Sequence, residues 1–199
     1  MSTATRPLTR AEKQQLTRRA LLDAARTVIA RNGIAGASHR DIAAEAGLTI
    51  GAIYANFANK ADLVVSVVED AHNEGTLLDA DSPSVRACLE DLARRLVEQA
   101  DNEPEITLLS LEFIAGSIRD PAIREQRLPH RAAEHAAWAR VIEDIAARSG
   151  ETLPMPALEF VEAVTSLGWS LLCTRAMAGP DVITEDFVVR ALGLLVQGC

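Results

Sequence analysis

The chain has 199 residues, 48% of which are hydrophobic, and a formal net charge of −8 at pH 7. This hydrophobic content excludes a disordered chain, and the lack of any run of 18 or more apolar residues excludes a membrane-spanning helix. Residues 1–15 contain no apolar run, so we expect no secretory signal.

The negative net charge hides an uneven distribution along the chain. Residues 1–60 carry nine basic and four acidic side chains, a net charge of +5, whereas the other 139 residues carry 11 basic and 24 acidic ones, a net charge of −13. A phosphate backbone would attract the first part and repel the second. The acidic total therefore does not exclude nucleic-acid binding, and the distribution indicates that one end of the molecule binds.

Helical periodicity of the apolar residues predicts an all-α fold with about nine helices and no sheet, because alternating strand patterns are nearly absent. A first helix is predicted over residues 10–31, with Asn32-Gly33 as its stop. Residues 38–60 predict two short helices, joined by a four-residue turn at Gly47, and the start of a third helix. A second helix held in this way fits the major groove of DNA.

Three polar residues of this segment are predicted helix caps. Ser38 and Asp41 have the spacing of a capping box, in which the hydroxyl accepts a first-turn N–H and the carboxylate reaches back to the cap. Thr49 is expected to cap the second short helix, and Asn59, with Asp62, the helix that follows. Ser38 and Asn59 could be caps alone, or could also contact DNA.

The remaining helices are predicted from their starting residues, which in chain order are Asn59, Ser82-Pro83, Pro104, Asp120-Pro121, Leu158 and Thr184. The helix after Pro104 is apolar on almost all sides, so we expect it to be buried on most faces. Pro129 is expected to kink or interrupt the helix that ends at Ser149-Gly150. Gly179-Pro180 is expected to end the helix that begins at Leu158.

Several residues at fixed spacings between positions 15 and 65 form a specific pattern. They are Ala24-Ala25, Asn32-Gly33, Ile42-Ala43, Ala46-Gly47, Gly51, Tyr54, Phe57 and Lys60. With this pattern the chain resembles TetR-family transcriptional regulators. The resemblance implies a helix-turn-helix DNA-binding domain over residues 1–60 and a helical ligand-binding and dimerisation domain over residues 61–199. It also implies a cytoplasmic regulator, typically a ligand-responsive repressor that binds a palindromic operator in double-stranded DNA, with no cofactor.

The resemblance places the second short helix in the major groove, although its segment TIGAIYAN contains no Arg or Lys. Tyr54 would give its hydroxyl to a phosphate, and Lys60 would meet another phosphate. Asn56 could pair with an adenine and Arg40 could reach a guanine. The expected DNA contacts are Ser38, Arg40, Thr49, Ile50, Gly51, Ala52, Tyr54, Asn56 and Lys60.

The last two helices carry more apolar residues than one inward face needs. The candidates are residues 167–177, where Gly168 would allow close approach, and the stripe Val188, Val189, Leu192, Leu195 and Val196. The resemblance implies a homodimer through these two helices, with a four-helix interface across a two-fold axis. The alternative is that both stripes belong to the intramolecular core.

The resemblance also implies a cavity among the central helices for a small apolar or amphipathic ligand. Glu112 stands out, because a carboxylate in an apolar run needs a wet cavity or a partner, and Arg119 or Arg175 could be that partner. The helix after Asn59 links the two domains, so it is the expected lever for a ligand-induced change. The candidate lining residues are Leu109, Glu112, Phe113, Trp138, Phe160, Val164, Trp169 and Arg175, and core packing is the alternative for each aromatic one.

The sequence gives little support for a metal site, a disulfide or an enzyme active site. His130 and Glu134 have helical spacing but no evident third ligand, so we expect no metal site. Cys88, Cys173 and Cys199 are far apart and odd in number, which favours reduced thiols in the cytoplasm over disulfides. Neither a phosphate-binding loop nor a nucleophile elbow is present, so we expect no enzyme. Besides a ligand-responsive repressor, the alternatives are a DNA-binding regulator controlled by a protein partner or lacking a ligand, and an all-helical enzyme or carrier.

Overall fold

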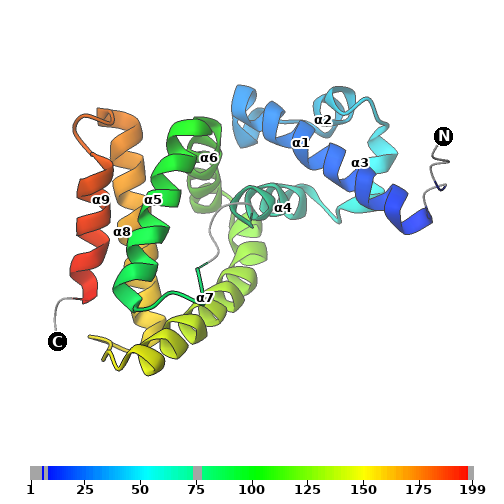
Figure 1. The fold of residues 1–199 in the computed structure, drawn as a ribbon. Helices are drawn as coiled ribbons and strands as arrows, with labels where there is room; N and C mark the ends of the chain where they lie inside the picture. Colours follow the sequence, from blue (N-terminus) through cyan, green and yellow to red (C-terminus); the bar gives the residue numbers. More distant parts are fainter. Residues whose placement is uncertain (1–5, 7–8, 74–77, 197–199) are drawn as a thin grey trace, which may run out of the picture.

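The computed structural model describes residue 6, residues 9–73 and residues 78–196, and Cys199 lies outside this part. The described residues form nine α-helices and one 3₁₀ turn without a strand, which confirms the predicted all-α fold (Figure 1). The helices are α1 (Arg10–Gly36), α2 (His39–Glu45), α3 (Ile50–Asn56), α4 (Lys60–Asn73), α5 (Val85–Asn102), α6 (Pro104–Arg119), α7 (Pro121–Ser149), α8 (Ala157–Ala178), α9 (Glu185–Gly193) and η1 (Leu194–Val196). None of them is long and apolar enough to cross a lipid bilayer.

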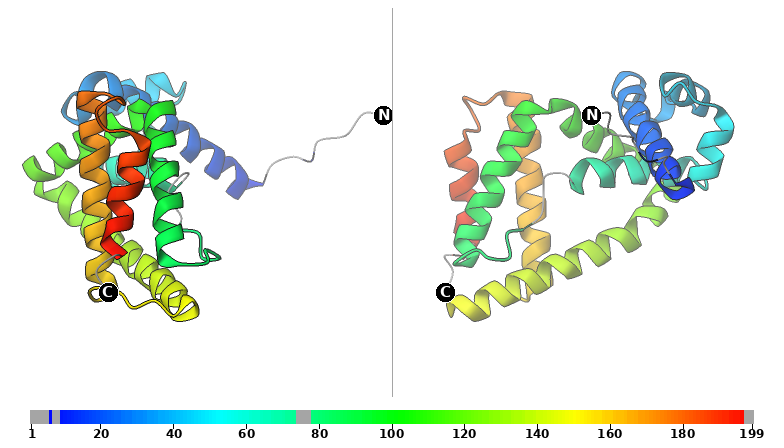
Figure 2. Two further views of the ribbon diagram at one scale, coloured as in Figure 1. Left: turned by 60° about the vertical axis from the view of Figure 1, so that its left-hand side comes forward. Right: turned by 45° about the vertical axis from the view of Figure 1, so that its right-hand side comes forward.

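The helices fall into two groups at opposite ends of the molecule. We call α1–α4 the N-terminal module and α5–α9 the C-terminal body. In the body, α5, α8 and α9 lie side by side, and α6 and α7 connect them to the module (Figure 1). Figure 2 shows α7 running along one edge of the molecule, from below α4 to the end of the body.

Each group has its own hydrophobic core. The first core is built by α1–α4, and Ile106, Leu109 and Phe113 of α6 and Ile123 of α7 complete it. The second core combines apolar residues of α5, α7, α8 and α9 around the fully buried Phe160. The first core thus extends beyond residue 60, because α4, part of α6 and Ile123 of α7 contribute to it.

Most predicted helix ends are confirmed by their capping contacts. The Asn59 side chain accepts the Asp62 N–H at 2.9 Å, and Thr184 accepts the Phe187 N–H at 3.2 Å. Helices α6 and α7 begin at the expected prolines, Pro104 and Pro121. These caps explain why the sequence alone located the helices.

One prediction about helix ends was wrong. Helix α5 is capped by Ser84, which accepts the Ala87 N–H at 3.0 Å, and not by Ser82, which is buried in the preceding turn. The predicted stop of α1 is confirmed in part, because Gly33 breaks the helix with a φ of 68° but helical backbone continues to Gly36. Pro129 does not interrupt α7, and a kink there stays a prediction.

The expectation that α6 is buried on most faces was also wrong. Ile106, Leu109 and Phe113 face the first core, whereas the opposite side is open. Only one side of α6 packs on the module, so an apolar stripe remains in solvent in the single chain. Its exposed large residues are Leu108, Leu111, Ile114 and Ile118.

For the last two helices, the structure assigns much of the predicted stripe to the intramolecular core. Val188 and Leu192 are fully buried in the second core, and Val189, Leu195 and Val196 pack against it. Gly168 faces Leu96 and Leu192 of the same chain. The surface left open on α8, α9 and η1 contains other large apolar residues that are exposed, namely Leu158, Met177, Phe187 and Leu194.

Candidate nucleic-acid interface

The helices α2 and α3 form a helix-turn-helix at the end of the molecule opposite α8 and α9 (Figures 1 and 2). Residues 46–49 join them, and Gly47 adopts a φ of 64° in this turn. Ile42, Ala43 and Ile53 are buried in the first core and fix the two helices against α1. The buried side of α3 leaves its other side directed outward.

The outward side of α3 and its N-cap carry four of the nine predicted DNA contacts. Thr49, Ile50, Gly51 and Tyr54 are exposed, and the Tyr54 side chain is 62% exposed. Thr49 is the N-cap residue of α3, but its hydroxyl makes no capping hydrogen bond, contrary to the prediction. This hydroxyl is therefore free to bind an outside group. Ala52 is half-buried and packs partly against the first core.

Ser38 acts mainly as a cap. Its hydroxyl oxygen accepts the Asp41 N–H, with 3.1 Å between nitrogen and oxygen. The same hydroxyl donates its hydrogen to the Asp41 carboxylate, with 2.5 Å between the two oxygens. The carboxylate thus binds the hydroxyl and not the cap backbone, so the predicted capping box is only half formed.

Asn56 is less available than predicted. Its amide nitrogen donates to the Ala52 carbonyl at 2.8 Å, and the side chain is half-buried. Its backbone carbonyl accepts a hydrogen bond from Arg18, whose guanidinium also lies 4.4 Å from the Phe57 ring centroid. Arg18 therefore holds α1 to the end of α3 and is not a free cation.

The basic residues of the module divide into paired and free cations. Arg6 pairs with Glu12, Arg19 with Asp23 and Asp70, Arg26 with Asp70, and Arg31 with Glu45. By contrast, the exposed Arg10, Lys13 and Arg40 have no ion pair or hydrogen bond within the described residues. Lys60 donates only to the backbone carbonyl of Ala35, at 3.4 Å. Four cations of the described module thus remain for an external anion.

Sequence reasoning missed His39, which lies beside Tyr54. Its Nδ1 is 3.3 Å from the Tyr54 hydroxyl oxygen, and the two rings meet edge to face with centroids 5.3 Å apart. The sequence held no signal for this contact, because the two residues lie 15 positions apart in different helices.

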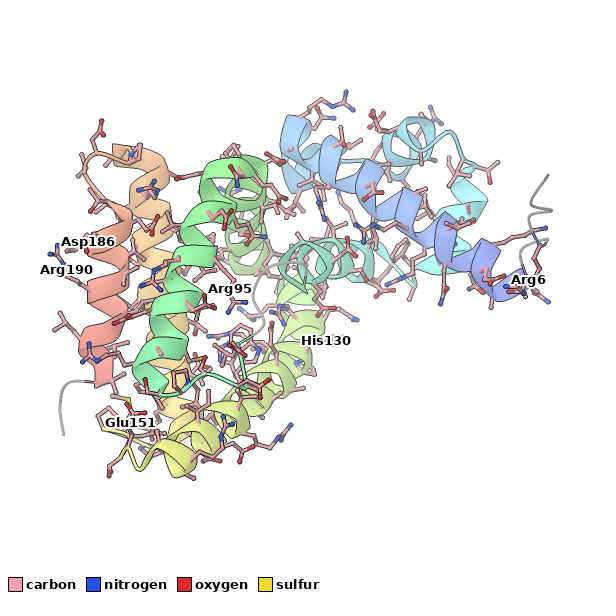
Figure 3. All side chains as sticks on the ribbon, in the orientation of Figure 1. Arg6, Arg95, His130, Glu151, Asp186 and Arg190 are labelled. Atoms are coloured by element: carbon pink, nitrogen blue, oxygen red, sulfur yellow. The ribbon has the colours of Figure 1, made fainter. Side chains whose placement is uncertain are left out.

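Two polar contacts connect the module to the body. The Glu112 carboxylate of α6 accepts the Ile34 N–H at 3.3 Å, beside the break at Gly33, so neither predicted arginine is its partner. The second contact joins α4 and α7 (Figure 3): His130 Nδ1 lies 2.9 Å from a Glu69 carboxylate oxygen, and Arg127 lies 3.8 Å from the same oxygen.

Burial in the interface of α4 and α7 disfavours the charged form of Glu69. Desolvation raises the pKa of this carboxyl above its usual range, although the charges of His130 and Arg127 oppose the shift. Glu134 and Asp62 add negative charge nearby and raise the pKa further.

The structure does not bring the eight predicted ligand-binding residues together. Leu109 and Phe113 belong to the first core, and Glu112 faces α1. Trp138, Phe160 and Val164 do meet, around a cavity of about 10 Å³ in the second core, which is room for roughly one water molecule. The other residues around this cavity are Leu78, Leu89, Leu92, Ile142, Val161 and Thr165, so the lining is almost entirely apolar. Trp169 is half-buried and lies outside it.

Arg175 has a structural environment. Its guanidinium forms a two-pronged ion pair with Asp101 of α5, at 2.9 and 2.6 Å, and donates to the carbonyls of Pro180 and Ile183. The hydrogen bond from Arg175 lowers the pKa of the Asp101 carboxyl below its usual range. The contact ties α5 to the turn between α8 and α9.

Metal binding has no geometric basis in the described part of the chain, where no three His, Cys, Asp or Glu side chains are grouped to hold an ion. Cys88 is buried and Cys173 half-buried, and neither forms a disulfide there. Burial raises the pKa of both thiols, which disfavours the reactive thiolate form.

Comparisons with known proteins bear on the module first. Residues 21–67 match the family model described as "Bacterial regulatory proteins, tetR family". The HTH-type transcriptional regulator TtgR of Pseudomonas putida is 41% identical over 61 residues, which are 31% of this chain and 29% of that protein. The curated relative is therefore matched over less than a third of its length.

Solved structures extend the likeness to the whole fold. A structure from Pseudomonas aeruginosa PAO1, assigned to a transcriptional regulator, has a TM-score of 0.75 at 22% identity, over 95% of this chain and 92% of that one. The transcriptional regulator FadR from Bacillus subtilis, solved in complex with stearoyl-CoA, has a TM-score of 0.69 at 17% identity, over 91% and 98% of the two chains. Residues 21–67 thus match the tetR family of bacterial regulatory proteins, and the chain as a whole shares its fold with solved transcriptional regulators.

Proposed function

We propose that this protein is a transcriptional repressor that binds a palindromic operator as a homodimer and releases it when a small ligand binds. The observation that carries the proposal is the outward face of α3, where exposed Thr49, Ile50, Gly51 and Tyr54 lie opposite residues buried in the core. A helix held in this way can enter the major groove. In this proposal residues 1–60 bind DNA, and residues 61–199 bind the ligand and the second subunit.

The unpaired cations supply the attraction to DNA. Arg10, Lys13, Arg40 and Lys60 have no carboxylate partner within the described residues, whereas the acidic body would be repelled by phosphate. Each phosphate contact releases counterions, so affinity should fall steeply with salt. Arg40 and Lys60 lie on either side of the exposed Tyr54 in sequence, and we assign phosphate contacts to all three. Thr49, Ile50, Gly51 and Ala52 would face the bases, with Ser38 at the phosphate backbone.

The test of DNA binding is selection of genomic fragments by the purified protein, followed by footprinting of the retained duplexes. We expect a protected site with two-fold symmetry and half-sites about 34–36 Å apart, or a multiple of this spacing. The Tyr54→Ala and Lys60→Ala variants should lose affinity without a change in melting temperature. Protein that retains no duplex at 50 mM salt would contradict the proposal.

Dimerisation would occur through the outer faces of α8 and α9. Met177 is 78% exposed and Leu194 is 60% exposed, and half-buried Trp169 and Cys173 lie on the same helix as Met177. On α9, Asp186 and Arg190 form an exposed ion pair at 3.1 Å (Figure 3). Exposed apolar surface of this kind usually marks a contact between proteins.

The oligomeric state tests this surface directly. Leu194→Glu should convert the dimer to a monomer in light scattering, because the new carboxylate would lose its water in the interface. Leu16→Glu, at an exposed leucine on α1, is the matched control and should leave the dimer intact. A wild-type monomer, or a dimer in both variants, would contradict the assignment.

The proposed ligand site is the cavity of the second core, near Trp138, Phe160 and Val164. Its apolar lining favours an uncharged apolar or amphipathic molecule, and the cavity must expand to admit it. FadR, which shares the fold, was solved with stearoyl-CoA. The bound ligand would change operator affinity through the Glu112 contact on α1 and the Glu69 contact between α4 and α7.

The small size of the cavity also favours a second candidate, a DNA-binding regulator without a small-molecule ligand or with a protein partner. Melting temperatures measured across a panel of apolar compounds separate the two. A repressor with a ligand should show an increase with at least one compound, and Val164→Phe, which fills the cavity, should abolish it. Operator binding without any such shift would favour the second candidate.

A further inference from the structure

The ring of His39 is placed to hold the ring of Tyr54. His39 Nδ1 lies 3.3 Å from the Tyr54 hydroxyl oxygen, and the ring planes make an angle of 87°. Tyr54 is largely exposed, whereas His39 is half-buried in the first turn of α2. The partly buried imidazole thus provides a fixed neighbour for a phenol that otherwise faces solvent.

Nδ1 is the ring nitrogen of His39 that has a hydrogen-bond partner within the described residues, because Nε2 is covered and has none. In the tautomer with a hydrogen on Nδ1, the imidazole donates to the Tyr54 oxygen. With Nδ1 as donor, the phenol keeps its own O–H for an outside acceptor, and the bond it accepts makes it a stronger donor.

We propose that His39 is the positioning residue of Tyr54: it fixes the phenol ring and directs the hydroxyl hydrogen to a DNA phosphate. This inference rests on the proposed DNA-binding function. An exposed tyrosine without such a contact must give up its rotational freedom when DNA binds, which weakens the complex. His39 removes part of that cost in the free protein and needs no contact with DNA.

The test is a double-mutant cycle on the full chain. The probe is a fluorescent duplex that the protein selects from a randomised pool, and the dissociation constant is measured by anisotropy. Tyr54→Phe and His39→Ala should each weaken binding by about 3- to 10-fold, in line with the loss of one hydrogen bond to a charged group. The double variant should be at most about 2-fold weaker than Tyr54→Phe alone, because His39 acts through the hydroxyl.

Two further measurements separate positioning from general structural damage. His39→Asn places an amide near the position of Nδ1 and should restore most of the affinity lost in His39→Ala. The slope of log affinity against log salt should be the same in His39→Ala as in wild type, whereas Lys60→Ala should lower it by about 0.9 for each phosphate that is no longer neutralised.

The outcomes distinguish this inference from the proposed function. Equal weakening by His39→Ala in the wild-type and Tyr54→Phe backgrounds would mean that His39 contacts DNA itself, and would overturn the inference. So would unchanged binding by His39→Ala, or no rescue by asparagine at an unchanged melting temperature. Wild-type protein that binds no duplex at 50 mM salt would overturn the proposed function first.

Discussion

The N-terminal module and the C-terminal body each have a hydrophobic core, but they differ in what remains on the outside. In the module, Arg19, Arg26 and Arg31 are paired with carboxylates, whereas Arg10, Lys13, Arg40 and Lys60 have no carboxylate partner within the described residues. In the body, the open faces of α6, α8 and α9 carry large apolar residues such as Ile118, Met177 and Leu194. The module therefore offers charge and hydroxyls to a partner, and the body offers apolar surface.

The largest expected effect tests whether the two cores are separate. Phe160 is fully buried in the second core, so Phe160→Ala should lower the free energy of unfolding by about 3–5 kcal/mol. Urea denaturation followed by circular dichroism measures it. If the cores unfold independently, a second transition from the module should keep its midpoint.

A single unfolding transition with a lower midpoint would contradict the view that the two cores are separate. It would mean that α6 and α7 couple the two cores into one cooperative unit. Ile53→Ala, in the first core, is the matched variant and should move the other transition in the independent case.

The Asp101 and Arg175 pair tests how the body is held together. Asp101→Asn leaves the buried guanidinium without its charge partner and should cost about 1–3 kcal/mol at neutral pH, since the Asp101 side chain is half exposed. The folded-state pKa of Asp101 is lowered, so its contribution is present above the ordinary pKa of an aspartate. It is lost as pH falls through the folded-state pKa.

Thermal unfolding of both proteins between pH 7 and pH 2 checks the sign. The difference between wild type and Asp101→Asn should shrink toward zero in acid, because the wild-type carboxyl is then protonated too. A constant difference over this range would show that the variant acts by altered packing and not by lost charge.

The module is tested by removing one free cation. Arg40→Ala should weaken operator binding by roughly 10-fold and lower the salt slope by about 0.9 for each phosphate that is no longer neutralised. Arg140→Ala on α7 removes an equally exposed and unpaired arginine of the described chain and should change neither quantity. Equal effects of the two variants would mean that only net charge matters.

Features that depend on residues close together in sequence could be predicted from the sequence. Helix starts at Pro104, Pro121 and Thr184 depend on local caps and were correct, and the tetR-like pattern of the module depends on residues close in sequence. The predicted start of α5 was wrong because Ser82 and Ser84 are both residue types that cap helices. In the folded chain Ser82 is buried, and Ser84 is the residue that caps the helix.

Contacts between distant segments were beyond sequence reasoning. Glu112 was expected to face a wet cavity or to pair with an arginine, yet it accepts a backbone N–H 78 residues away in sequence, beside the break at Gly33. The stripe on α9 faces its own core, where Val188 and Leu192 are fully buried. The eight expected ligand residues were separated for the same reason, since periodicity gives the inward face of each helix but not its neighbour.

The smallest effect concerns the contact between module and body. The pKa of Glu69 is raised by burial, so its contribution to stability is present below the unfolded-state pKa and is lost as pH rises through the folded-state pKa. At neutral pH wild type therefore carries the cost of a partly buried charge. Glu69→Gln should be as stable as wild type or more stable, by less than about 1 kcal/mol, since a quarter of the side chain is exposed.

Urea denaturation at pH 7.5 and in acid measures this difference, which should vanish once wild-type Glu69 is protonated. Glu143→Gln, at an exposed position of α7, should have no effect at either pH. Destabilisation by Glu69→Gln at neutral pH would show that the ion pairs with His130 and Arg127 outweigh burial. The ion pairs between α4 and α7 would then stabilise the packing of the module on the body. Charge would in that case contribute to the contact between the two parts, although only the module leaves free cations for a partner.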